Sequence, residues 1–371
     1  MVRILKSEPS TAPRIDVVSP PAALPGGEVE IRGINLGPVA LARTAGSPES
    51  DPAAGPSFAP AIGPGWRRPV AMLGDLAAPV LLSRGARLTL RVPEEAETGR
   101  LRILQNGAQS NAVELRVANL LATGAHMVAN PVMDNSGGIY LTFSGERGQE
   151  SPISVFRIER DGEMRPFVRG IINATGLAVD YEENVYVSSR HEGKVYKVAR
   201  NGASTVFAEG MGVATGMAFD ADQNLYVGDR SGTIFKIAPD RQIFVFATLE
   251  PSVAAYHLAF GPDGTLFVSG PTTSSFDAVY AINSDGVSSV LQRGLGRPQG
   301  IAVDIAGNVY VAASLRGRRG VVSISPEGEM SLVLAGTGIV GFTFVPGGGA
   351  LVATNTSLYH VALGVEGWRL I

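Results

Sequence analysis

The stretch VATGMAFDADQNLYVGDRSGTIFKI, residues 213–237, repeats a pattern that already occurs as NATGLAVDYEENVYVSSRHEGKVYKV at residues 173–198. Equivalent points follow one another at intervals of 40, 42, 42 and 41 residues, at Gly176, Gly216, Leu258, Gly300 and Gly341. A weaker copy, ANPVMDNSGG at 129–138, precedes them and brings the number of units to six. A period of this length indicates a fold that is built from repeated structural units.

The composition inside one unit is typical of strands. LYVGDR (225–230), GTIFKIAPD (232–240) and QIFVFATL (242–249) are short β-rich runs that alternate with clusters of Asp, Asn, Gly and Pro. Four strands in about 41 residues correspond to one blade of a β-propeller, and six units predict a six-bladed propeller over 128–371. We expect the recurring polar residues at the first turn to act as turn and hydrogen-bond formers: Asp180, Asp220, Asp304, Asn184, Asn224 and Asn308.

The first part of the chain predicts a separate all-β domain. PRIDVVSPPAALPGGEVEIRGINLGP (13–38) alternates apolar and polar residues around a Pro-Gly-Gly turn, and short strands continue to Val117. No helical periodicity interrupts them, so we expect a small β-sandwich over 13–117. Its middle holds a long Pro/Gly-rich loop at 42–69, and we expect 118–127 to be a linker to the propeller.

Composition excludes several functions. The net charge of −3 provides no strong field for nucleic acid or an anionic membrane, so we expect neither partner. The absence of cysteine excludes disulfides, thiol nucleophiles and thiolate metal sites. The N-terminal residues lack an apolar core of signal-peptide length, and no apolar run reaches 18 residues. We expect a soluble protein, cytoplasmic by default, or exported if a leader has been removed from the sequence.

Two resemblances follow from these segments. Residues 13–117 resemble an IPT/TIG domain, an immunoglobulin-like β-sandwich, through SPPAALPGGEVEIRGINLG, VAMLGDLAAPVL, LRVPEEAETGRLRIL and SNAVELRV. The remainder is similar to NHL-repeat propellers, close to the gluconolactonase/senescence-marker family, through GLAVDYEENVYV, GMAFDADQNLYV and GIAVDIAGNVYV. Together they imply an all-β chain in which an N-terminal immunoglobulin-like sandwich precedes a six-bladed propeller.

The repeat also predicts which residues meet at one mouth of the propeller channel. The residues just before each innermost strand, and those in the loop between the second and third strands, belong to that face. We expect the ligand-binding residues to come from these two sets: Asn130, Thr175, Thr215, His257, Gln299, Arg190, Asp229, Arg230, Thr272, Thr273 and Arg316. The hydroxyl-rich loop SGPTTSSFDAVY (269–280) contributes Thr272 and Thr273, and it is either a polyol-binding loop or simply a polar one.

The gluconolactonase resemblance implies a divalent cation at this mouth, held by Glu, Asn and Asp. At the corresponding positions this sequence carries Asn130, His257 and Gln299, and no carboxylate remains in the inner ring. Hard cations prefer anionic oxygen ligands, so the resemblance implies the scaffold without the metal-dependent lactonase. We predict no cofactor; a cation such as calcium is expected only if a lactonase activity survives, with these three residues as its weak ligands.

The mouth residues leave several functions open. Arg190, Arg230 and Arg316 either bind carboxylate, phosphate or sugar-acid oxygens or form salt bridges between blades. His257 is either a structural residue or a ligand-contacting, catalytic acid/base group. Our first hypothesis is a protein that binds a small polar or anionic ligand, or a protein partner. The alternatives are a lactone or ester hydrolase, with His257 as base and Gln299 or Asn130 orienting the carbonyl, and a pure protein scaffold.

Overall fold

The computed structural model describes residues 12–37, 39–40, 66–272 and 277–368. The chain forms two compact units, 1–117 and 118–371. Every regular element in the described ranges is a strand. These ranges contain no helix that is long and apolar enough to cross a membrane. Residues 42–65 of the predicted loop lie outside the described residues. Its end is not loop, because Trp66–Arg67 form β5, which pairs with β4 (Val39–Ala40).

Unit 1 contains two larger sheets. One has the order β1 (Arg14–Ser19), β3 (Glu28–Ile34), β9 (Arg87–Arg91) and β8 (Val80–Arg84). The other runs β2 (Ala22–Ala23), β12 (Val113–Val117), β10 (Gly99–Gln105), β6 (Val70–Leu73) and β7 (Leu76–Ala78), with β11 (Ala108–Gln109) paired to β10. Alternate residues such as Ile31 in β3 and Ile103 in β10 are fully buried, as expected for strands with one face on a core.

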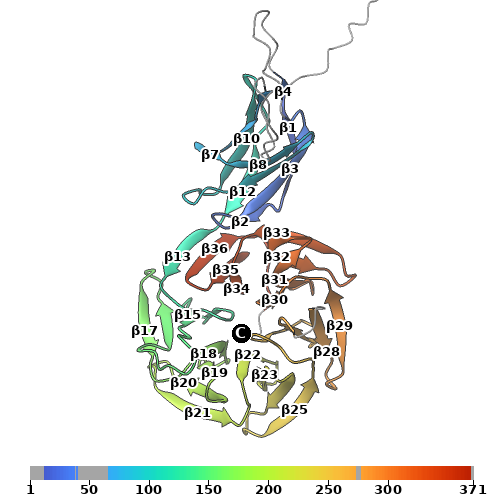
Figure 1. The fold of residues 1–371 in the computed structure, drawn as a ribbon. Helices are drawn as coiled ribbons and strands as arrows, with labels where there is room; N and C mark the ends of the chain where they lie inside the picture. Colours follow the sequence, from blue (N-terminus) through green and yellow to red (C-terminus); the bar gives the residue numbers. More distant parts are fainter. Residues whose placement is uncertain (1–11, 38, 41–65, 273–276, 369–371) are drawn as a thin grey trace, which may run out of the picture. The chain divides into compact units, whose positions relative to one another are not determined.

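Unit 2 is built from four-stranded antiparallel sheets arranged around a centre (Figure 1). The first four are β14–β17 (Val132–Met133, Ile139–Thr142, Val155–Ile158, Met164–Val168), β18–β21 (Ala174–Val179, Val185–Ser189, Lys194–Val198, Ser204–Glu209), β22–β25 (Ala214–Phe219, Leu225–Asp229, Thr233–Ile237, Ile243–Thr248) and β26–β29 (His257–Phe260, Leu266–Ser269, Ala278–Ile282, Ser288–Arg293). They are followed by β30–β33 (Ile301–Val303, Val309–Leu315, Arg318–Ile324, Met330–Ala335) and by β34–β36 (Ile339–Val345, Gly349–Thr354, Ser357–Ala362). The first strand of each sheet lies innermost.

The last sheet takes its outer strand from the beginning of the unit. β13 (Asn119–Thr123) pairs antiparallel with β36, so Asn119 lies opposite His360. The prediction that 118–127 is a linker is therefore wrong over these residues. This pairing gives the last sheet its fourth strand, and it joins the first strand of the unit to the last one, which closes the ring.

The repeated glycines of the sequence lie where neighbouring inner strands approach one another. A Cβ atom at Gly216 would overlap the carbonyl oxygen of Tyr256, and one at Gly341 would overlap that of Ala129. A Cβ at Gly300 would lie 2.7 Å from the Cα of Gly341. None of these three glycines has a positive φ, so space alone requires them. The repeat is thus architectural at this point, because it lets neighbouring inner strands pack closely against one another.

The recurring aspartates organise the turn between the first two strands of a sheet, as predicted. The carboxylate of Asp304 accepts the backbone N–H groups of Ala306 and Asn308 at 2.9 and 2.8 Å, and also the Asn308 side chain and the Tyr310 hydroxyl at 2.7 and 3.0 Å. Asp180 and Asp220 accept from their own asparagines in the same way. The structural role expected for these residues is confirmed.

We expect Asp304→Ala to lower the free energy of unfolding by about 2–4 kcal/mol, because several donors around a buried carboxylate lose their acceptor together. Asp263→Ala is the matched control. That aspartate is exposed and accepts only from Thr265, so its loss should cost less than about 1 kcal/mol. Urea unfolding followed by circular dichroism measures both, and equal losses would contradict this role for Asp304.

Candidate functional site

One cavity of about 240 Å³ opens where the inner strands begin, and we call it the mouth pocket. Its lining includes six of the predicted site residues, namely Thr175, Arg190, Thr215, Arg230, His257 and Gln299. Arg297 and Asn355 also line it, beside small apolar residues. The structure therefore brings these six residues together, and their role in ligand binding stays a prediction.

The antiparallel pairing of each sheet explains why these residues meet. Ala214 at the start of β22 lies opposite Asp229 at the end of β23, so Thr215 and Arg230 come to the same end of their sheet. The same register in the preceding sheet pairs Ala174 with Ser189, next to Arg190. A period of about 41 residues then repeats this geometry from one sheet to the next.

The arginines of the mouth pocket have no carboxylate partner. No Asp or Glu lines the pocket, and the ion pairs found among the described residues do not include Arg190, Arg230 or Arg297. Arg230 instead donates to the carbonyl oxygens of Ser252 and Val253, at 3.4 and 3.1 Å. The predicted alternative of salt bridges between blades is therefore not what the structure shows for Arg190 and Arg230.

Arg190 lies in an unfavourable environment for a charged side chain. Burial lowers the pKa of its guanidinium, and repulsion from Arg230 and Arg147 lowers this pKa further. Its Nε atom is buried and has no hydrogen-bond partner. A buried donor without an acceptor is unfavourable, and like charges held close together add to that cost. An anion in the pocket would relieve this repulsion between the guanidinium groups.

A second cavity of about 650 Å³ continues from the mouth pocket toward the last two sheets. The two cavities share Arg297, Gln299 and Asn355, and the second one adds Arg319 and Ser314. No carboxylate lines this cavity either. The site thus offers room for a ligand longer than a single small anion.

His257 is the first residue of β26 and is 2% exposed. Burial lowers the pKa of its imidazole to about 4, so the ring is neutral at pH 7. Its Nδ1 atom is buried without a hydrogen-bond partner. A neutral imidazole with a free ring nitrogen can accept a proton or a hydrogen bond, but the pocket does not favour its charged form.

This burial predicts a specific pH dependence of stability. An unfolded histidine takes up its proton near pH 6.5, whereas His257 in the folded protein does so only near pH 4. The unfolded state therefore binds more protons in this range, and stability is lost as the pH falls from about 6.5 through 4. The loss amounts to about 3 kcal/mol.

His257→Gln should remove this contribution. Relative to the wild type, the variant should gain about 3 kcal/mol of unfolding free energy between pH 7.5 and pH 4. The carboxylates titrate in both proteins, so the difference between the two urea-unfolding series isolates the histidine. Parallel pH curves for the two proteins would show that His257 is protonated as easily in the folded state as in the unfolded one.

Thr175 and Thr215 line the pocket, and the hydroxyl group of each already donates a hydrogen bond to a backbone carbonyl oxygen. Thr215 donates to the carbonyl oxygen of Gly228 at 2.7 Å and accepts the backbone N–H of Tyr256 at 3.1 Å. Thr175 donates to the carbonyl oxygen of Asn173 at 2.8 Å. Thr215 therefore links neighbouring inner strands, and a ligand would have to use the remaining acceptor capacity of the two hydroxyls.

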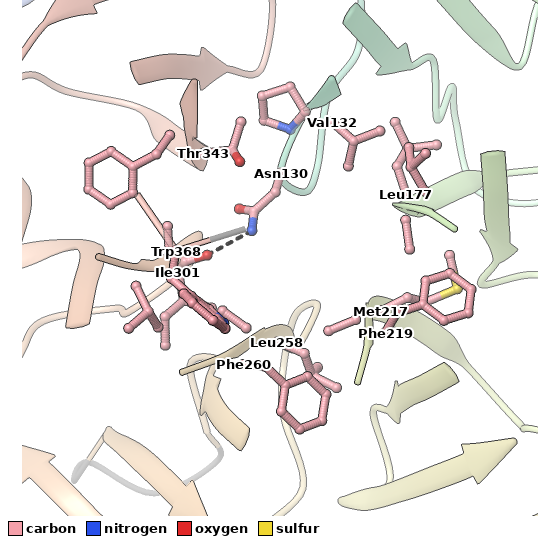
Figure 2. Close-up of a pocket in the computed structure, with 18 of the residues that line it drawn as sticks. Asn130, Val132, Leu177, Met217, Phe219, Leu258, Phe260, Ile301, Thr343 and Trp368 are labelled. Atoms are coloured by element: carbon pink, nitrogen blue, oxygen red, sulfur yellow. Dashed lines mark hydrogen bonds between the residues drawn. The ribbon is translucent and has the colours of Figure 1, made fainter. Parts of the chain in front are cut away.

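Asn130 lies in a different cavity, at the opposite end of the inner strands (Figure 2). Its side chain donates to the carbonyl oxygen of Ile301 at 3.0 Å and accepts the backbone N–H of Phe342 at 3.1 Å. The amide thus ties neighbouring inner strands together. It does not share a cavity with His257 and Gln299, with which the sequence grouped it as a weak metal ligand.

Asp229, Thr272 and Arg316 do not line the mouth pocket. Asp229 is buried and accepts the backbone N–H of Val213 at 2.8 Å, so it fixes its own loop. Thr272 donates its backbone N–H to Asp277 at 2.9 Å. Arg316 lies in the turn between β31 and β32 with a φ of 51° and lines neither of the two cavities described above. Thr273 lies outside the described residues.

The residues at the mouth do not fit a hard divalent cation. Among the described residues, no group of three or more His, Asp and Glu side chains lies close enough to hold a metal ion. The mouth pocket contributes one imidazole, amides and positively charged arginines. Arginine repels a cation, and calcium and magnesium prefer carboxylate oxygen.

Sequence reasoning missed Arg297 as a site residue. This arginine stands between a glycine and a proline in GLGRPQG (294–300), and its backbone has a φ of 50°. Its backbone N–H donates to Asp277 at 3.0 Å, which holds the segment in place. An arginine three residues before the inner-strand glycine, next to Gln299 in the ring, was the signal that could have identified it.

Comparisons with known proteins support the fold of this chain. No protein-family model and no curated protein matches the chain. Among solved structures, a putative gluconolactonase is 18% identical, with 68% of this chain and 93% of that chain covered and a TM-score of 0.56. An auxiliary nutrient binding protein from Bacteroides thetaiotaomicron is 12% identical, covering 94% and 97% with a TM-score of 0.53. Virginiamycin B lyase from Staphylococcus aureus is 12% identical, covering 79% and 94% with a TM-score of 0.51. The chain therefore has an all-β fold with propeller-type neighbours.

Proposed function

We propose that unit 2 is a six-bladed propeller whose mouth pocket binds a small, hydroxylated anion such as a sugar acid. The observation that carries this proposal is the group of arginines without carboxylate partners, in which Arg190 keeps a buried, unsatisfied Nε donor. Guanidinium groups pair with carboxylate or phosphate through charge-assisted, often bidentate hydrogen bonds. The amides of Gln299 and Asn355 are suited to the hydroxyl groups of the same ligand.

The N-terminal unit is the second part of this proposal. Its two sheets with alternating buried residues are consistent with an immunoglobulin-like module of the IPT/TIG kind. Neighbours that cover nearly the whole chain include one described as an auxiliary nutrient binding protein. That description supports a binding function, with the sandwich as an appended interaction module and a protein partner as a further candidate.

Calorimetric titration at low salt tests the proposal. D-Galacturonate and D-gluconate are the anionic probes, inorganic phosphate reports a bare anion, and D-galactose is the neutral sugar matched to galacturonate. We expect saturable binding of the sugar acids that weakens with added salt, and at least tenfold weaker binding of D-galactose. Equal affinities for galacturonate and galactose would mean that the arginines do not select the ligand.

Hydrolysis of a lactone or ester at the same pocket is the second candidate. It is favoured by His257, which lines the pocket and whose neutral ring has the form of a general base. In this function His257 would accept the proton of an attacking water, Gln299 would orient the carbonyl, and the arginines would stabilise the developing oxyanion. Acid release from D-glucono-1,5-lactone, with and without EDTA, tests it. EDTA-resistant turnover that is lost in His257→Gln would support hydrolysis, and equal turnover of both proteins would exclude His257 as the base.

A further inference from the structure

The second cavity, of about 650 Å³, has a positively charged lining of its own. Arg297 and Arg319 line it, and both are exposed. The ion pairs found in the described part of the chain include neither of these arginines. Asp277, whose carboxylate accepts the backbone N–H of Arg297 at 3.0 Å, lines neither cavity. Both guanidinium groups can therefore meet an anionic ligand.

A change in the repeat creates space for this cavity. Arg190 and Arg230 stand five residues after the first residues of β19 and β23, and Ser314 stands five residues after Val309, the first residue of β31. A small side chain thus replaces the arginine of the two earlier sheets. β31 and β32 have seven residues each, whereas β19 and β20 have five. The longer hairpin pairs Arg319 with Ser314 and so places an arginine farther along.

The backbone around Ser314 positions the two arginines of the second cavity. Ser314 and Gly296 exchange backbone hydrogen bonds at 2.8 and 2.9 Å, and Arg297 follows Gly296 directly. Arg319 lies opposite Ser314 on its other edge, in β32. Arg297 lines both cavities, whereas Arg319 lines only the second one. One arginine therefore lies where the two cavities join, and the other lies beyond this junction.

The size and lining of the two cavities indicate the class of ligand. A cavity of about 150 Å³ takes benzene, so the mouth pocket, at about 240 Å³, holds about one substituted six-membered ring. A ligand that also fills the second cavity must be longer. Gln299, Asn355 and Ser314 offer hydrogen bonds to hydroxyl groups along it. No described Phe, Tyr or Trp side chain lines either cavity, so a nucleobase finds no stacking surface there.

We propose that the mouth pocket and the second cavity together bind an anionic oligosaccharide. One carboxylate would lie at Arg190 and Arg230, and the carboxylate of a neighbouring sugar acid would lie at Arg297 and Arg319. This inference rests on the function proposed for the mouth pocket, and it adds a second anion subsite. Two carboxylates on one ligand bind more tightly than one, because the second contact forms within the complex.

Calorimetric titration at low salt compares D-galacturonate with digalacturonate, its α-linked disaccharide. We expect one disaccharide to bind per protein, about tenfold more tightly than the monosaccharide. Either monomethyl ester of digalacturonate has the same length but a single carboxylate, and its advantage over galacturonate should be only about twofold. Equal affinities for galacturonate and digalacturonate, or for digalacturonate and its esters, would overturn the second subsite alone. Absence of binding by every probe would overturn the function proposed for the mouth pocket as well.

Two substitutions in the β31–β32 hairpin complete the test. Arg319→Gln should lower the affinity for digalacturonate about fivefold and leave the affinity for galacturonate unchanged. Arg316→Gln removes the same charge from the same hairpin, but Arg316 lines neither cavity, so we expect neither affinity to change. An unchanged affinity for digalacturonate in Arg319→Gln, or an equal loss in both variants, would overturn the proposal.

Discussion

Gly216→Ala should lower the free energy of unfolding by about 3–5 kcal/mol, enough to unfold a protein of ordinary stability. The new methyl group would overlap the carbonyl oxygen of Tyr256 on the neighbouring inner strand. That atom belongs to the backbone and cannot rotate away, so the two strands must separate. Replacing a glycine by alanine otherwise stabilises a chain slightly, because it restricts the unfolded state. Here the clash outweighs that gain.

Gly99→Ala is the matched control for this prediction. It is also a strand glycine without a positive φ, and the nearest atom to its added Cβ lies at an ordinary contact distance of 3.6 Å. We expect a change of less than about 1 kcal/mol there. Urea unfolding followed by circular dichroism compares the two. If Gly216→Ala is as stable as Gly99→Ala, the inner strands do not approach as closely as described.

Arg190→Gln should lower the affinity for a sugar acid about 30-fold, which corresponds to about 2 kcal/mol for a charge-assisted hydrogen bond. The same change should leave the stability of the free protein unchanged or raise it. The reason is that Arg190 lacks an ion-pair partner and is repelled by Arg230 and Arg147. A residue that binds the ligand but lowers the stability of the free protein is typical of functional sites.

Arg293→Gln serves as the comparison for this arginine. Arg293 is exposed at the end of β29 and lines neither cavity of the mouth, so its loss should change neither affinity nor stability. Calorimetry with D-galacturonate and thermal unfolding of the free proteins provide both readouts. A large loss of stability in Arg190→Gln with unchanged affinity would assign Arg190 a structural role instead.

Much of the architecture could be predicted because one signal is repeated. The spacing of Gly176, Gly216, Gly300 and Gly341 follows from the space between inner strands, and the aspartates follow from the turn that comes next. The period also located the mouth residues, because register within a hairpin carries Thr215 and Arg230 to the same end. The sequence did not reveal that β13 completes the last sheet, since a single strand far from its partner shows no repeat of its own.

The individual roles of the site residues depend on contacts that a repeat does not encode. Asn130 occupies a position equivalent to Thr175, yet its amide bonds the backbone of two neighbouring strands and lines a cavity other than the mouth pocket. Arg297 lies outside the repeat pattern and enters the pocket through a turn with positive φ. Trp368 lines the same cavity as Asn130 because the chain after β36 returns along β30. Each of these outcomes depends on tertiary packing.

The most direct measurement is a crystal structure of the protein with D-galacturonate. We predict that the sugar acid lies in the mouth pocket, with its carboxylate about 2.7–2.9 Å from guanidinium nitrogens of Arg190 and Arg230. Its hydroxyl groups should reach the amides of Gln299 and Asn355. A mouth pocket that stays free of the ligand while the carboxylate binds elsewhere on the protein would contradict it.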